Sequence, residues 1–183
     1  LPSVIDDIQE NITHIIRGED HITNTAFHIQ IFEAFDAKIP IFGHHPFIVD
    51  QEGKGFGKRY NSLSIENLRT QGFENLTLIN YLLSVGTSLN LTKEIEISKI
   101  IKNFDISNLS NSSPKFSFDV LRSLNKDILQ KYSFSDVKNR FLEQGFKEAN
   151  SNFWLFIKNN IDFFHDSVEW REIVTSSIKY ADG

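Results

Sequence analysis

The sequence contains no cysteine and no methionine among its 183 residues. Without cysteine, disulfide bonds and thiolate metal sites are excluded, and a cytoplasmic location is favoured. Methionine is missing at position 1 as well, so we expect the chain to be a piece of a longer protein. No apolar run approaches the roughly 20 residues that a membrane-spanning helix needs. The acidic start of the chain is also unlike a signal peptide, so we expect no membrane partner.

Basic residues are also fewer than acidic residues in this sequence. The chain has 19 basic against 24 acidic residues and a formal net charge of −5, which excludes a surface that is basic overall. A local basic patch remains compatible with this balance, because Lys54, Lys58, Arg59 and Arg69 fall within one short stretch that holds few acids. On charge alone, an ordinary solvated loop is the better explanation of these four residues.

The first 50 residues alternate between β and α patterns. β-branched residues at 4–8 and 12–16 predict two strands. A helix capped by Thr23 or Asn24 should follow the second strand. Its spacing of apolar residues predicts an inner face made of Ala26, Ile29, Phe32 and Phe35.

A further strand is predicted at residues 41–49, after Pro40. The order strand, helix, strand indicates a right-handed crossover in a parallel sheet. A glycine-rich loop follows at 51–63. From Ser64, which can cap the first helix, the patterns become helical, and one face of the next helix should carry Leu76, Ile79, Leu82 and Leu83. The polar stretch 105–114 is the best internal linker. The last helices are expected near residues 117–130, 135–144, 150–161 and 167–177, and a stripe of Trp154, Ile157, Ile161 and Phe164 is expected to pack in the core. The fold class is therefore α/β turning to mostly α.

Three patches of polar residues could carry chemistry. They are Asp6 and Asp7 together with residues 17–21, the pair His44 and His45, and the loop that ends at Lys58 and Arg59. All three are predicted at or just after the carboxyl ends of strands, which share one crevice in an open α/β sheet. The first patch contains Arg17, whose planar fork of donors suits a carboxylate or a phosphate.

Each patch also has an explanation without chemistry. Arg17 could form a structural ion pair with Glu19 or Asp20, and His44 could be a hydrogen-bonded histidine beneath a loop. The loop 53–59 lacks the spacing of a Gly-x-x-x-x-Gly-Lys phosphate loop. Its final Lys58 and Arg59 could still neutralise charge on a polyphosphate.

Three segments, at residues 4–25, 40–46 and 53–59, together resemble the glutamyl-tRNA synthetases, a class I aminoacyl-tRNA synthetase family. The resemblance implies that residues 1–63 are the C-terminal half of a Rossmann-like catalytic domain, with the signature loop at 53–59. It further implies a helical stem-contact region at 64–110 and a helical region at 111–183 that leads to the anticodon-binding domain.

The resemblance also implies roles for single residues. In the family, the arginine at the position of Arg17 holds the carboxylate of the glutamate substrate, with Asp20 and Ser3 in the same pocket. The residues that border the adenine and ribose of ATP would be His44, Phe47 and Ile48. Lys58 would stabilise the pyrophosphate leaving group, and Arg59 completes the loop. The rest of that loop departs from the family pattern, with Gly55, Phe56 and Gly57 in place of its lysine, leucine and serine.

The implied activity is the condensation of glutamate with ATP and Mg²⁺ to glutamyl-adenylate, followed by transfer of glutamate to tRNA. The partners would be the glutamate acceptor tRNA, and the glutamine acceptor in some relatives, with a monomeric full-length enzyme. The family's His-Ile-Gly-His signature should precede Leu1, so the isolated chain is expected to be inactive. Two alternatives stay open: a non-catalytic tRNA-binding or regulatory descendant, and a glutaminyl or non-discriminating synthetase.

Overall fold

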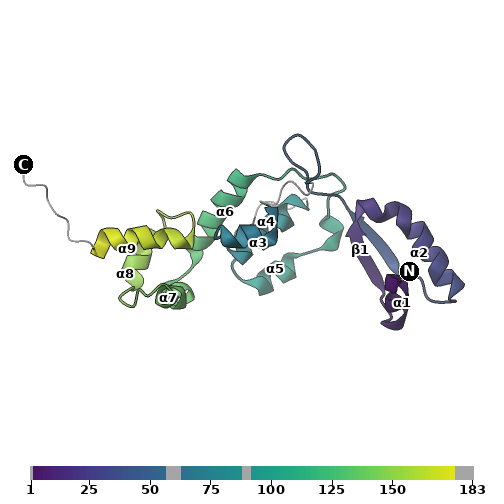
Figure 1. The fold of residues 1–183 in the computed structure, drawn as a ribbon, viewed down its shortest axis with the longest axis horizontal. Coiled ribbons are helices and arrows are strands. Elements are labelled where there is room, and N and C mark those ends of the chain that lie inside the picture. The colour runs from purple at the N-terminus through teal and green to yellow at the C-terminus, as the bar shows by residue number, and fades with distance from the viewer. Residues whose placement is uncertain (1, 57–62, 88–91, 176–183) are drawn as a thin grey trace, which may run out of the picture. The chain divides into compact units, whose positions relative to one another are not determined.

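The computed structural model describes residues 2–56, 63–87 and 92–175. The chain divides into two compact units, which are presented separately (Figure 1). Unit 1 comprises Leu1–Phe56, Gly86–Ser88 and Ile106–Phe116, and unit 2 comprises Gly57–Val85, Leu89–Asp105 and Ser117–Gly183. Among the described residues, no helix is long and apolar enough to cross a membrane. The predicted domain boundaries after residues 63 and 110 remain predictions.

Unit 1 is built on two parallel strands, β1 (His14–Gly18) and β2 (Ile41–His45). Helix α1 (Pro2–Gln9) precedes β1, and the short 3-10 helix η1 (Glu19–His21) leads from β1 into helix α2 (Ile22–Ala34). Helix α2 runs beside the strand pair and contacts α1 (Figure 1). The strand, helix, strand order and the parallel pairing confirm the prediction for this segment.

The predicted strand at residues 4–8 is wrong, because this segment is part of helix α1. Apolar residues at Val4, Ile5 and Ile8 follow helical spacing and do not alternate as a strand would. Pro2 stands at the first helical position, where its fixed φ and missing N–H are tolerated. The helix buries Val4 completely and ends at Gln9, and the left-handed Asn11, with a φ of 54°, follows two residues later.

Helix α2 starts a little earlier than predicted, with His21 as its N-cap in place of Thr23 or Asn24. Of its predicted inner face, Phe32 is buried whereas Phe35 is 58% exposed. Phe35 caps the carboxyl end of the helix, directly before the left-handed Asp36, and so has left the helical register.

The segment predicted as a linker at 105–114 largely belongs to unit 1. It contains the 3-10 helix η3 (Ile106–Asn108) and then runs alongside Val49. The N–H of Val49 donates to the carbonyl of Pro114 at 2.9 Å, and the N–H of Phe116 donates to the carbonyl of Val49 at 2.8 Å. These bonds join residues more than sixty positions apart, so local composition could not predict them.

Unit 2 is helical. Its described elements are α3 (Ile65–Thr70), α4 (Asn75–Val85), α5 (Ile97–Asn103), α6 (Phe118–Lys131), α7 (Phe134–Glu143), α8 (Ser151–Ile157), the 3-10 helix η4 (Phe164–Asp166) and α9 (Ser167–Thr175). The predicted serine cap is confirmed, because Ser64 Oγ accepts from the N–H of Asn67 at 3.1 Å. The predicted stripe of Trp154, Ile157, Ile161 and Phe164 is confirmed as core.

The face of α4 that packs inward differs from the predicted one. Ile79 and Leu82, two members of the predicted apolar stripe, are 37% and 47% exposed. The side of α4 that packs inward carries Asn80, a buried polar residue. Its amide donates to the carbonyls of Leu76 and Glu94, and its oxygen accepts from the Glu94 N–H and from a threonine hydroxyl. Four satisfied hydrogen bonds outweigh the exposure of two apolar side chains.

Candidate active site

The register of the two strands sets Arg17 opposite His44 and Gly18 opposite His45. Each strand ends within one residue of these pairs, so both polar patches lie at the carboxyl ends of neighbouring parallel strands. This is the edge of an open α/β sheet at which ligands bind. The prediction that residues 17–21 share one edge with His44 and His45 is therefore confirmed, whereas Asp7 of the first patch lies elsewhere.

Arg17 is held by side chains of helix α2. Its Nη1 donates to Nδ1 of His28 at 3.2 Å, and its Nη2 donates to Oγ1 of Thr25 at 2.7 Å. The guanidinium carbon also lies 5.2 Å from the centre of the Phe42 ring. Within the described part of the chain, Arg17 forms no ion pair with Glu19 or Asp20, so that explanation is wrong.

The guanidinium keeps donors that the described residues do not satisfy. It has five N–H groups, of which His28 and Thr25 take one each. Its Nε is buried and has no hydrogen-bond partner among the described residues. An unsatisfied buried donor on a charged group is costly, and an acceptor with two oxygens would remove that cost. The site is thus suited to a carboxylate or a phosphate.

His28 must be neutral to make its bond with Arg17, since a guanidinium only donates. Nδ1 of His28 therefore carries the lone pair. Burial, and next the positive charge of Arg17, hold the pKa of His28 below its usual value of 6.5. Helix α2 thus presents an uncharged acceptor to the arginine at neutral pH.

His44 is partly buried, and its Nε2 lies 2.9 Å from Oγ1 of Thr25. The prediction that His44 is a hydrogen-bonded histidine is correct for this nitrogen. The same contact joins it to Arg17 through a single hydroxyl oxygen. His44 can therefore be hydrogen-bonded within the fold and still belong to the site.

Asp20 and Phe47 converge on Gly18. A Cβ placed on this glycine would lie 2.7 Å from Oδ1 of Asp20 and 3.2 Å from Cε1 of Phe47. The N–H of Phe47 also donates to the carboxylate of Glu19 at 3.3 Å. The residue next to Arg17 thus contacts both a predicted glutamate-pocket residue and a predicted ATP neighbour.

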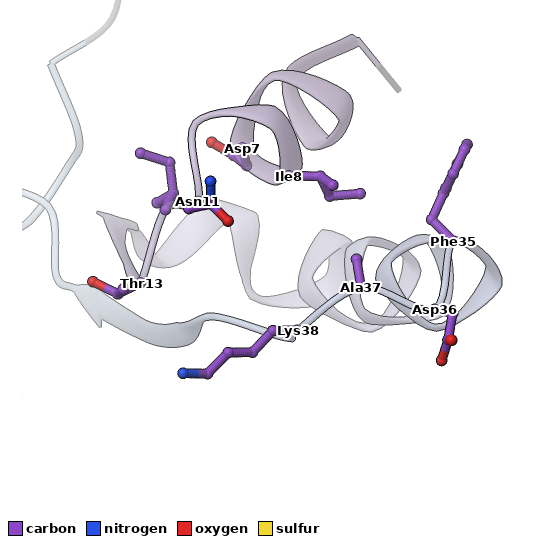
Figure 2. Close-up of a pocket in the computed structure, with 9 residues that line it drawn as sticks. Asp7, Ile8, Asn11, Thr13, Phe35, Asp36, Ala37 and Lys38 are labelled. Carbon is purple, nitrogen blue, oxygen red and sulfur yellow. The ribbon is translucent and has the colours of Figure 1, made fainter.

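Other predicted residues are placed differently. Ser3 is exposed in the first turn of α1, and Ile48 is half-buried just beyond β2. Lys58 and Arg59 lie outside the described residues. Asp7, predicted to share the crevice of Arg17, instead lines a separate cavity of about 440 Å³ near the start of β1 (Figure 2). It lies there because α1 is a helix that ends before β1 begins.

Thr25 and His28 were not among the predicted site residues, and the contact that Glu19 of the first patch makes with Phe47 was not predicted either. The sequence carries a signal for the first two, because His21, Thr25 and His28 follow i, i+4, i+7 spacing on α2. A polar stripe on a crossover helix points to the strand ends that the helix covers. Glu19 has no such signal, since its partner is a backbone N–H far along the chain.

A sequence profile described as "tRNA synthetases class I (E and Q), catalytic domain" matches residues 1–123. The chain belongs to this family. Two relatives named glutamate–tRNA ligase 1 are similar along nearly the whole chain. The one from Wolbachia sp. subsp. Brugia malayi is 38% identical over 179 residues, and the one from Brucella canis is 37% identical over 182 residues. They match 98% and 99% of this chain, which spans about 40% of the length of either relative.

Solved structures of the class I synthetase family share the fold. A glutamate–tRNA ligase from Elizabethkingia meningosepticum, in complex with its amino acid, aligns with a TM-score of 0.76 at 23% identity. The alignment covers 93% of this chain and 39% of that one. A second, from Elizabethkingia anophelis, gives a TM-score of 0.73 at 24% identity, with 91% and 39% coverage. The predicted fold class, part of a class I synthetase catalytic domain followed by helices, is confirmed.

Proposed function

We propose that the full-length protein containing this chain is a cytoplasmic glutamate–tRNA ligase. The observation that supports this most is the arginine at the carboxyl end of β1, with unsatisfied donors, set opposite His44 by the strand register. In a synthetase of this family, a carboxylate-binding arginine beside the ATP site brings both reactants together. Positioning of this kind supplies much of the rate enhancement.

In the proposed reaction, a carboxylate oxygen of glutamate attacks the α-phosphorus of ATP. The bond to the β-phosphate bridging oxygen breaks, and pyrophosphate leaves. A hydroxyl of the terminal adenosine of tRNA then attacks the activated carbonyl, and AMP leaves. Arg17, with Asp20 and Ser3, is proposed to hold glutamate, while Lys58 and Arg59 neutralise the charge that develops on the leaving pyrophosphate.

The residues proposed to border ATP suit that ligand. Phe47 is 44% exposed, so its ring can stack on a purine, and His44 and Ile48 lie on either side of it in the sequence. Among the described residues, no group of three or more histidine or acidic side chains is arranged to hold a metal. When bound with ATP, Mg²⁺ would neutralise charge on its phosphates.

Glutamate-dependent exchange between ATP and pyrophosphate by the full-length protein tests this proposal. We expect exchange with glutamate, charging of glutamate tRNA, and no exchange by the isolated 183 residues. Arg17→Lys should raise the KM for glutamate about 100-fold, because a lysine cannot replace a planar fork of donors. A folded full-length protein that binds tRNA without exchange would instead be a non-catalytic descendant. Charging of glutamine tRNA would identify a non-discriminating or glutaminyl enzyme.

A further inference from the structure

We propose that Thr25 is a positioning residue that couples the amino-acid subsite to the ATP subsite through its hydroxyl. This inference rests on the proposed function and adds a residue to it. Thr25 lies on helix α2, away from both strands in sequence, and is half-buried. Its Oγ1 is the common partner of Arg17 and His44, the two residues proposed to hold different substrates.

The hydroxyl of Thr25 has its full set of partners. A threonine hydroxyl offers one hydrogen and two lone pairs. It accepts from Nη2 of Arg17 at 2.7 Å, which takes one lone pair. It donates its hydrogen to the carbonyl of His21 at 3.1 Å, an atom that only accepts. The remaining lone pair faces Nε2 of His44 at 2.9 Å, so this nitrogen must carry a hydrogen and donate it.

These three bonds restrict how Arg17 and His44 can be oriented. The carbonyl of His21 anchors the hydroxyl to the first turn of α2, so its lone pairs point in set directions. Arg17 and His44 are then oriented by the same oxygen atom. A shift of either side chain weakens its bond to that atom and frees the other. Binding of a carboxylate to Arg17 should therefore help to order His44, and the reverse should hold by linkage.

A second contact ties the same two parts of the site together. The carboxylate of Glu19 in η1 accepts from the N–H of Phe47, the residue proposed to stack on adenine. His44 and Phe47, two of the residues proposed to border ATP, are thus both bonded to the segment that follows Arg17. The Glu19 contact is more exposed than that of Thr25. The half-buried hydroxyl of Thr25 is therefore expected to carry more of the coupling than the Glu19 contact.

Four variants of the full-length protein test the role of Thr25. Thr25→Val keeps the shape of the side chain and removes the hydroxyl. Thr25→Ala also removes the hydroxyl, and alanine favours the helical conformation. Thr25→Ser keeps the hydroxyl. Thr23→Val makes the same chemical change as Thr25→Val at an exposed position of α2 and serves as the matched control. Glutamate-dependent ATP–pyrophosphate exchange gives KM for glutamate, KM for ATP and kcat for each, and thermal melts check folding.

We expect Thr25→Val and Thr25→Ala to raise both KM values about tenfold each, because a hydrogen bond to a charged partner is lost. Thr25→Ser should stay within about twofold of the parent protein, because the hydroxyl is retained. Thr23→Val should behave as the parent does. A rise in one KM alone, or unchanged values in folded Thr25→Val, overturns the coupling role. A parent protein without any glutamate-dependent exchange refutes the proposed function itself, which is a different result.

Discussion

At the residue scale, Arg17 obtains its suitability for an anion from its neighbours. Its charge comes from its own chemistry, but its direction comes from Thr25 and His28, which lie one helical turn apart. Two fixed bonds leave the remaining donors preorganised, so less conformational entropy is lost when an acceptor binds. A lysine in the same place would have neither the fork nor the two-point attachment.

The neutral state of His28 makes binding at Arg17 dependent on pH. Burial lowers the pKa of His28 most, the positive charge of Arg17 lowers it further, and Asp7 raises it, so that the net pKa lies below 6.5. The acceptor on Nδ1 is fully present above pH 6.5 and is lost as pH falls toward the lowered pKa. We expect the KM for glutamate of the full-length protein to rise between pH 7.5 and pH 5.5 as the protonated fraction grows. The rise should be less than about tenfold, because tenfold is what a histidine with the ordinary pKa of about 6.5 would give and the pKa of His28 is lower.

His28→Gln is the control for this prediction. A glutamine side chain can accept the same bond from Arg17 but does not titrate, so its KM for glutamate should stay flat over the same range. The carboxylates of glutamate stay ionised there and cannot cause the change. An equal rise in His28→Gln would assign the pH dependence to a group other than His28.

At the scale of elements, Asn125 shows how one buried amide organises three segments of unit 2. Its oxygen accepts from the Glu74 N–H at 2.8 Å and from the Thr77 hydroxyl at 2.9 Å, both at the start of α4. Its nitrogen donates to the carbonyl of Asp162 at 2.7 Å, before η4. Asn125 itself lies on α6 and is fully buried. A polar group in such a place fixes how helices pack because every partner must be matched.

Asn125→Leu should therefore destabilise the chain by about 2–4 kcal/mol, since one buried and two partly buried polar groups lose their partner. Urea unfolding followed by fluorescence measures this, because the buried Trp154 reports on the helical core. Asn139→Leu makes the same change on the exposed face of α7 and should cost no more than about 0.5 kcal/mol. Equal midpoints for the two variants would show that the Asn125 bonds contribute nothing net.

At the scale of the whole chain, the two units differ in how much they bury. In unit 1, the buried hydrophobic residues among those described are Val4, Phe32 and Val49, whereas most of the buried hydrophobic side chains belong to unit 2. Unit 1 also exposes many large apolar side chains: Ile12, Ile16, Ile22, Phe27, Phe35, Ile39, Ile41, Phe47 and Ile106. Less burial means less hydrophobic stabilisation per residue in unit 1.

We therefore expect amide hydrogen exchange of the 183-residue chain to be uneven. Amides of β1 and β2 should exchange at least about 100-fold faster than those of α6, because local opening is easier where few apolar contacts hold a segment. Exchange measured by mass spectrometry on peptides from the two units checks this. Equal protection in both would mean that the chain opens only as one cooperative unit.

Some of the fold follows from the sequence directly. The Ser64 cap, the helices of residues 118–175 and the strand, helix, strand order all depend on local spacing and turn chemistry. The position of Arg17 at a strand end follows from the same patterns. The strand predicted at 4–8 is wrong because the helical spacing of its apolar residues outweighs their β-branched character.

Only the tertiary structure decided which partners these elements meet. The buried face of α4 depends on Asn80 and a distant loop, and the course of residues 106–116 depends on Val49. The site depends in the same way on Thr25, which joins Arg17 to His44 across the strand pair. The physical reason is that local propensities determine where helices and strands form. Hydrogen bonds between residues far apart in sequence determine how they face one another.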